Sequence, residues 1–231
     1  MAKKIRVAIV DDHQGIIDGY LYRLSRAPNI EVVATLLYGA GLEELLARQP
    51  VDVLVLDVQV PTSPENPNPY PVLHLIPKLL QLHPNLDILV ISMHAQRTLI
   101  HAILEAGASG YILKEDQAAI RELASIICAV ANGGIHLSPL AYQQLARRNT
   151  GELTQPLSIR QREALSLCAA FPDASSADLA QRMNIANSTL RNILSDAYLK
   201  LNVRSRAAAI ARARQLGLIL LDPAKLEIQP E

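Results

Sequence analysis

Four short apolar segments in the first half of the chain each run into residues that could bind a metal ion or a phosphoryl group. In chain order these residues are Asp11 and Asp12, then Asp57, Ser92 and Lys114. If the four segments are parallel strands of one open sheet, their carboxyl ends lie at the same edge, where ligands of such sheets gather. Carboxylate oxygens suit Mg²⁺. The sequence therefore predicts a magnesium site at this edge that also receives an anion such as a phosphoryl group.

The chemistry expected of this cluster is phosphoryl transfer to a carboxylate. A magnesium ion between Asp12 and Asp57, with Asp11 nearby, would offset the negative charges, and Lys114 would add a positive charge against the phosphoryl oxygens. Asp57 ends the most apolar segment, VDVLVL, and is predicted as the phosphoryl acceptor. Each residue alone has a plain structural alternative, such as a helix cap or an exposed ion pair. Their arrival in order at successive segment ends favours the site.

The segments that must position these residues alternate between strand and helix patterns. Strands are expected at residues 5–10, 30–35, 53–57, 87–92 and 110–113, and helices at 15–27, 41–49, 72–83, 96–106 and 116–131. This alternation predicts a flavodoxin-like fold, a doubly wound, parallel five-stranded sheet with helices on both faces.

The second half of the chain reads as helical. A short helix is expected to begin at Pro139 with Ser138 as its cap. From Ser158 onward only helices are expected, at 159–170, 175–183, 187–201 and 205–216. The predicted division is an α/β domain at 1–135, a linker with a short helix at 136–156, an all-α four-helix domain at 157–221 and a tail at 222–231.

The segments VDDH, LDVQVP, ILVIS and GYILK resemble the corresponding stretches of bacterial two-component receiver domains, and the resemblance spans residues 3–135. It implies that a histidine kinase phosphorylates Asp57. It also implies a magnesium site and a conformational switch. The implied ligands are Asp11, Asp12, Asp57 and the backbone carbonyl of Gln59, and the implied switch residues are Ser92 and Tyr111, with Lys114 contacting the phosphoryl group. The added phosphoryl charge would draw the Ser92 hydroxyl toward it, and Tyr111 would fill the vacated space.

The main departure from that pattern is the segment PTSPENPNPYP at residues 61–71, which contains five prolines. Relative to the receiver pattern, the segment has an apparent insertion of about seven residues. Its composition predicts an extended, semi-rigid loop beside the site. The loop is either a partner-specific lip over Asp57 or a tolerated surface insertion. Pro77 lies in the next helical pattern and predicts a kink or a late helix start.

Residues 157–203 resemble the LuxR-type helix-turn-helix of response regulators of the NarL/FixJ family. The segment NSTLRNILSDAYLKL would be the recognition helix, and the outer face of its N-terminal end would meet base edges in the major groove. The predicted base contacts are Arg191, Asn192 and Ser195, and the predicted phosphate contacts are Arg182, Thr189 and Lys200. The sequence departs from the usual family pattern at Gln161, Ser176, Ala186 and Ile193, which puts the affinity and the target sequence in question.

The balance of basic and acidic side chains differs between the two halves of the chain. Residues 1–135 carry 10 basic and 14 acidic side chains, whereas residues 156–219 carry 9 basic and 4 acidic ones, which makes the second half the candidate for double-stranded DNA. The two cysteines, Cys128 and Cys168, suit reduced thiols in a cytoplasmic protein. His94 and His101 are expected on a solvated helix face, and no membrane span is expected.

Together these patterns predict a phosphorylation-controlled, DNA-binding transcriptional regulator that pairs as a homodimer on two half-sites. It would not be an enzyme beyond its own Mg²⁺-dependent phosphorylation and dephosphorylation. Two alternatives stay open, a regulator that binds DNA without phosphorylation and a phosphotransferase or phosphohydrolase with Asp57 as nucleophile. Such enzymes commonly carry a second acid two residues after the nucleophile, where this chain has Gln59.

Overall fold

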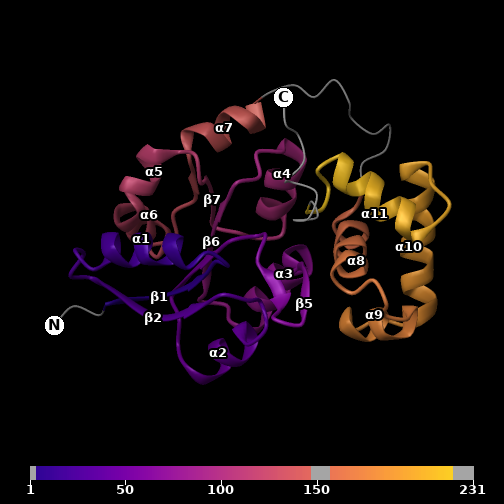
Figure 1. Ribbon diagram of the computed structural model, residues 1–231, viewed down its shortest axis with the longest axis horizontal. Coiled ribbons are helices and arrows are strands. Elements are labelled where there is room, and N and C mark those ends of the chain that lie inside the picture. The colour runs from indigo at the N-terminus through magenta and orange to yellow at the C-terminus, as the bar shows by residue number, and fades with distance from the viewer. Residues whose placement is uncertain (1–3, 147–156, 221–231) are drawn as a thin grey trace.

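The computed structural model describes residues 4–146 and 157–220, which form an α/β domain and an all-helical domain (Figure 1). The second part of the predicted linker, residues 147–156, and the predicted tail at 222–231 lie outside the described residues. Within the described ranges, no helix has both the length and the apolar character needed to cross a bilayer.

The α/β domain is built on a parallel sheet in the order β2-β1-β3-β6-β7-β8. Its strands are β1 (Ile5–Val10), β2 (Ile30–Leu36), β3 (Val53–Leu56), β6 (Asp87–Ser92), β7 (Gly110–Leu113) and β8 (His136–Leu137). The sheet therefore has six strands instead of the predicted five. The sixth strand pairs Gly110 with His136. A side chain at Gly110 would bring Cβ within 2.6 Å of the His136 carbonyl oxygen, so glycine is what allows the edge strand to approach.

Two apolar layers cover the sheet, because successive residues of each strand face opposite sides. Helices α1 (Gln14–Leu24), α5 (Gln117–Arg121) and α6 (Leu123–Val130) pack on one face. Helices α2 (Leu42–Arg48), α3 (Val72–Leu82), α4 (Arg97–Glu105) and α7 (Pro139–Ala146) pack on the other. The helix predicted at 116–131 is divided at Glu122, whose backbone leaves the helical conformation. Ser138 caps α7 as expected, with its Oγ accepting the Ala141 N–H.

The proline-rich segment is an antiparallel hairpin of β4 (Pro61–Ser63) and β5 (Asn66–Pro69). A two-stranded ribbon tolerates prolines because it needs few ladder hydrogen bonds. Helix α3 follows at once from Val72 and contains Pro77, so the late start that Pro77 suggested is wrong.

The helical domain consists of α8 (Ile159–Ala170), α9 (Ser176–Arg182), α10 (Asn187–Leu201) and α11 (Arg206–Gln215). Ser158 and Ser175 cap α8 and α9, each in a reciprocal capping box with the residue three positions on. Helix α10 buries the predicted side chains Leu190, Leu194, Ala197 and Leu201, with Tyr198 half-buried. Figure 1 shows α8 on the side of the α/β domain and α10 on the outer side of the molecule.

Candidate phosphorylation site and DNA-binding surface

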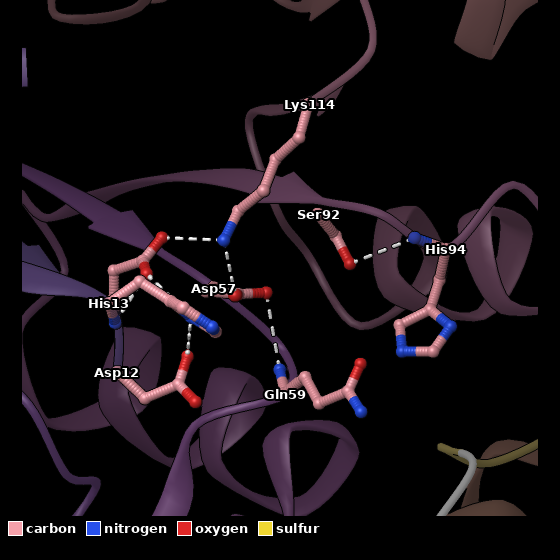
Figure 2. Close-up of polar contacts among 8 residues, drawn as sticks. Asp12, His13, Asp57, Gln59, Ser92, His94 and Lys114 are labelled. Carbon is pink, nitrogen blue, oxygen red and sulfur yellow. Dashed lines mark hydrogen bonds and ion pairs between the residues drawn. The ribbon is translucent and has the colours of Figure 1, made fainter. Parts of the chain in front are cut away.

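The carboxyl ends of β1, β3 and β7 bring two carboxylates and an ammonium into contact, as Figure 2 shows for Asp57 and Lys114. Lys114 Nζ lies 2.7 Å from Asp57 Oδ2 and 2.7 Å from Asp11 Oδ2. The three side chains are 7%, 5% and 2% exposed, so water screens these charges weakly. The strand ends thus bring Asp11, Asp57 and Lys114 together, and the lysine forms an ion pair with each carboxylate.

Burial and like charge set the electrostatics of the cluster. Burial raises the pKa of Asp57 above its ordinary value, Lys114 opposes that rise, and the charge of Asp11 adds to it. Burial alone would lower the pKa of Lys114, but the charges and hydrogen bonds of Asp57 and Asp11 outweigh burial and raise it. Asp12 brings a third carboxyl group to the cluster against one lysine, and such an oxygen-rich, acidic set suits a divalent cation.

Asp12 stands at the rim of the site, 28% exposed, with its Oδ1 2.7 Å from His13 Nδ1. Ligand atoms of Asp11, Asp12 and His13 lie within 4.8 Å of one another, a spacing that one ion could bridge. The backbone N–H of Gln59 donates to Asp57 Oδ1 at 3.2 Å, which fixes the main chain where the carbonyl ligand was predicted. The carboxylate oxygens of the three aspartates and the carbonyl oxygen of Gln59 are hard donors, which fit Mg²⁺.

Ser92 and Tyr111 are both fully buried and meet at His94. Ser92 Oγ accepts the His94 N–H at 3.2 Å, and the Tyr111 hydroxyl donates to the His94 carbonyl at 2.8 Å. Ser92 lies beside Asp57 on the side away from Asp12 (Figure 2). Both members of the predicted switch pair thus bond to the backbone of His94, and the Tyr111 ring is packed inward.

His94 is the residue that the sequence analysis misplaced. It was expected on a solvated helix face, but it precedes the first turn of α4 and is 5% exposed. Burial and the charge of Lys114 lower its pKa. His101, by contrast, is exposed and lies 3.2 Å from Glu105 one helical turn on. The signal that could have placed His94 is its position two residues after a buried strand end.

A cavity of about 940 Å³ opens over the acidic cluster. Its walls come from α1 and α5, from the loops that follow the strands and from the β4–β5 hairpin. Pro61 and Pro67 in the wall belong to the loop that was predicted beside Asp57, whereas the wall residues Ile16, Tyr20 and Met93 were not foreseen from sequence.

The predicted base contacts Arg191, Asn192 and Ser195 are exposed together on α10. Of the predicted phosphate contacts, Thr189 is exposed at the start of the same helix. The other two are engaged within the domain: the Arg182 guanidinium lies 3.9 Å from the centre of the Phe171 ring, and Lys200 Nζ donates to Gln161 Oε1 at 3.1 Å. The outer face of α10 thus offers arginine and asparagine, the residue types that pair with guanine and adenine.

An acidic site at parallel strand ends, joined to a helix-turn-helix domain, defines a signal-dependent regulator of two domains. A family model described as "Response regulator receiver domain" matches residues 7–125, and one described as "Bacterial regulatory proteins, luxR family" matches residues 155–213. The chain belongs to the response regulators whose receiver domain precedes a LuxR-type DNA-binding domain. It is accordingly a DNA-binding transcriptional regulator, and this membership supports the prediction that it is not an enzyme.

Relatives match over nearly the whole chain. The transcriptional regulatory protein DegU of Brevibacillus brevis is 27% identical over 234 residues, covering 94% of this chain and 95% of the relative. The DNA-binding transcriptional activator DevR/DosR of Mycobacterium tuberculosis is 30% identical over 219 residues, covering 92% and 95%. A solved structure of the RcsB response regulator of Salmonella typhimurium has a TM-score of 0.62 at 23% identity, covering 93% of this chain and 98% of that chain. The predicted family and regulator class are confirmed, and the fold class is confirmed apart from the strand count.

Proposed function

We propose that Asp57 accepts a phosphoryl group from a sensor histidine kinase and that this modification controls DNA binding by α10. The observation that carries the proposal is the Lys114 ammonium held between Asp11 and Asp57 at the strand ends. Receiver domains generally use Mg²⁺. Asp11, Asp12, Asp57 and the Gln59 carbonyl would hold the ion, which supplies charge neutralisation when bound.

The transfer step needs one nucleophile and one leaving group. A carboxylate oxygen of Asp57 attacks phosphorus, a P–O bond forms, and the N–P bond of the phosphohistidine donor breaks. The electron pair of that bond stays on the histidine nitrogen, which takes up a proton from water. Lys114 balances charge on the phosphoryl oxygens, and the Gln59 N–H orients the carboxylate before attack. Ser92 then moves to donate its hydroxyl to the new phosphoryl group, and this movement breaks the contact in which its Oγ accepts the His94 N–H.

Intact-mass measurement after incubation with acetyl phosphate and Mg²⁺ tests this proposal. The wild-type chain should gain one phosphoryl group, and Asp57→Asn should gain none because an amide does not form the acyl phosphate. Asp87→Asn is a matched control, since Asp87 lies at the opposite end of β6. Phosphorylation of Asp57→Asn at the wild-type rate would show that the acceptor lies elsewhere.

DNA binding without phosphorylation is a second candidate, favoured by the placement of α10. The α/β domain holds α8 and the end of α11, while Arg191, Asn192 and Ser195 remain exposed. Under the first candidate, phosphorylation would therefore act by arranging or pairing the DNA-binding domains on two half-sites, as a homodimer, and not by uncovering α10. Binding-site selection on random duplex DNA, with and without acetyl phosphate, separates the two candidates. Equal selection of one sequence in both conditions would favour the second.

The proposed setting is the cytoplasm, where a kinase and DNA are both available. Support comes from Cys128 and Cys168, which are free thiols in the part of the chain that is described.

A further inference from the structure

The tip of the β4–β5 hairpin touches two places at once. Pro67 lines the cavity over Asp57, together with Pro61 at the start of the hairpin. The adjacent residue, Asn66, donates its side-chain N–H to the carbonyl oxygen of Ala170 at 3.1 Å. One peptide unit therefore separates the wall of the phosphorylation cavity from the DNA-binding domain.

Hydrogen bonds join the hairpin to the segment after β2 and connect its own two strands. On its outer side, the N–H groups of Gly39 and Ala40 donate to the carbonyls of Pro61 and Thr62 at 2.9 and 2.8 Å. Across the two strands, Thr62 Oγ1 donates to the Asn68 carbonyl at 2.8 Å. Its prolines restrict the backbone further. A displacement at its base is thus carried to its tip.

The side chain of Asn66 is held in the orientation that reaches α8. Its Oδ1 accepts from the backbone N–H of Asn68 at 3.2 Å and from Asn68 Nδ2 at 2.8 Å. With the oxygen engaged twice, the amide nitrogen faces Ala170. Ala170 is the last residue of α8, where a helix leaves carbonyls without partners in the helix, so Asn66 supplies a bond that the helix end lacks.

Helices α3 and α4 make further polar contacts with the DNA-binding domain. His74 Nδ1 lies 2.6 Å from Glu163 Oε1, in a pair that is 12% and 7% exposed. Thr98 Oγ1 lies 2.9 and 2.8 Å from the carbonyls of Leu216 and Gly217. Of these contacts, only the one made by the hairpin comes from an element that also lines the cavity.

We infer that the β4–β5 hairpin couples occupation of the phosphorylation cavity to docking of α8. The inference rests on the proposed role of Asp57 and adds the route by which the second domain senses it. The hairpin begins two residues after Gln59, whose N–H holds Asp57 Oδ1. A phosphoryl group on Asp57 replaces the hydrogen bond between the Gln59 N–H and Asp57 Oδ1, and it fills space beside Pro67. The hairpin then shifts, and Asn66 moves with it. Coupling is reciprocal, so loss of docking also alters the cavity.

Hydrogen exchange of the full chain, read by mass spectrometry, tests the coupling. Beryllium fluoride with Mg²⁺ serves as the phosphoryl mimic, and peptides from residues 165–174 report on the end of α8. In the wild type, the mimic should change exchange in this segment. Asn66→Ala should lower its protection about fivefold before the mimic is added, the effect of one neutral hydrogen bond, and should abolish the further change.

Glu65→Ala is the matched control, because Glu65 lies in the exposed turn of the same hairpin and accepts a hydrogen bond from Ser63. It should respond as the wild type does. A full wild-type response in Asn66→Ala would overturn the coupling. Binding of the mimic is read separately in peptides from residues 87–94. If the wild type showed no change there, the proposed role of Asp57 would fail, and the coupling with it.

Discussion

Replacing Lys114 by Met should cost about 3–5 kcal/mol of folding stability in the absence of divalent ions, the penalty for removing one partner of a buried ion pair. Methionine keeps the apolar stem of the side chain and removes only the charge. Lys114 Nζ makes two contacts of 2.7 Å, and Asp11 and Asp57 are almost fully buried. The variant leaves these two carboxylates facing each other without a counter-charge.

The stability lost in Lys114→Met should depend on pH, because the neighbouring Asp57 titrates. Burial already raises the pKa of Asp57 in the folded protein, so the folded state binds the Asp57 proton more readily than the unfolded chain does. The contribution of such a group is fully present below about pH 4 and is lost as pH rises through the folded-state pKa. Removing Lys114 raises that pKa further. Lys114→Met should therefore lose less stability at about pH 5 than at about pH 7.

Urea unfolding followed by circular dichroism, in chelator and at both pH values, measures the effect. Lys78→Met is the matched control, because Lys78 pairs with Glu43 but is 40% exposed, and an exposed pair contributes about 0.2–1 kcal/mol. Mg²⁺ at about one hundred times its dissociation constant should return about 2.7 kcal/mol to Lys114→Met. A loss below about 1 kcal/mol, equal to that of the control, would refute the reasoning about the buried cluster.

The other predictions concern the DNA surface, the switch and the sheet edge. Arg191→Ala should weaken binding to a selected operator by about 1–3 kcal/mol and leave binding to random duplex nearly unchanged, as measured by fluorescence anisotropy. Tyr111→Phe leaves the buried His94 carbonyl without its donor and should lower the free energy of unfolding by about 1–3 kcal/mol; an unchanged urea midpoint would contradict the buried hydrogen bond. Gly110→Ala places Cβ 2.6 Å from the His136 carbonyl and should speed hydrogen exchange in β8, and unchanged protection would argue against that close approach.

The acidic site was predictable from sequence because its residues follow long apolar segments, whose type and order fix where a parallel sheet ends. Strand β8 was not predictable, since two residues show no periodicity and their pairing depends on the missing side chain at Gly110. The β4–β5 hairpin was not predicted either, because its sequence gives a signal against strands. Its prolines argue against strands, and it is defined by the pairing of β4 with β5 and by the bonds from Gly39 and Ala40, neither of which shows in the sequence pattern.

The domain interface was also beyond sequence reasoning. Arg162 and Glu163 look like a solvated helix face, yet both are buried because Glu105 and His74 of the receiver domain pair with them. Sequence patterns report the periodicity of one element at a time. They do not report which charged face another domain will cover.

One titration shows whether phosphorylation of Asp57 controls DNA binding. The affinity of the full chain for its selected operator is measured before and after treatment with acetyl phosphate and Mg²⁺, for the wild type and for Asp57→Asn. The affinity of the wild type should change about 5- to 150-fold, the usual range for coupled sites, and that of the variant should not change. A phosphorylated wild type with unaltered affinity, or an equal change in both proteins, would contradict the claim.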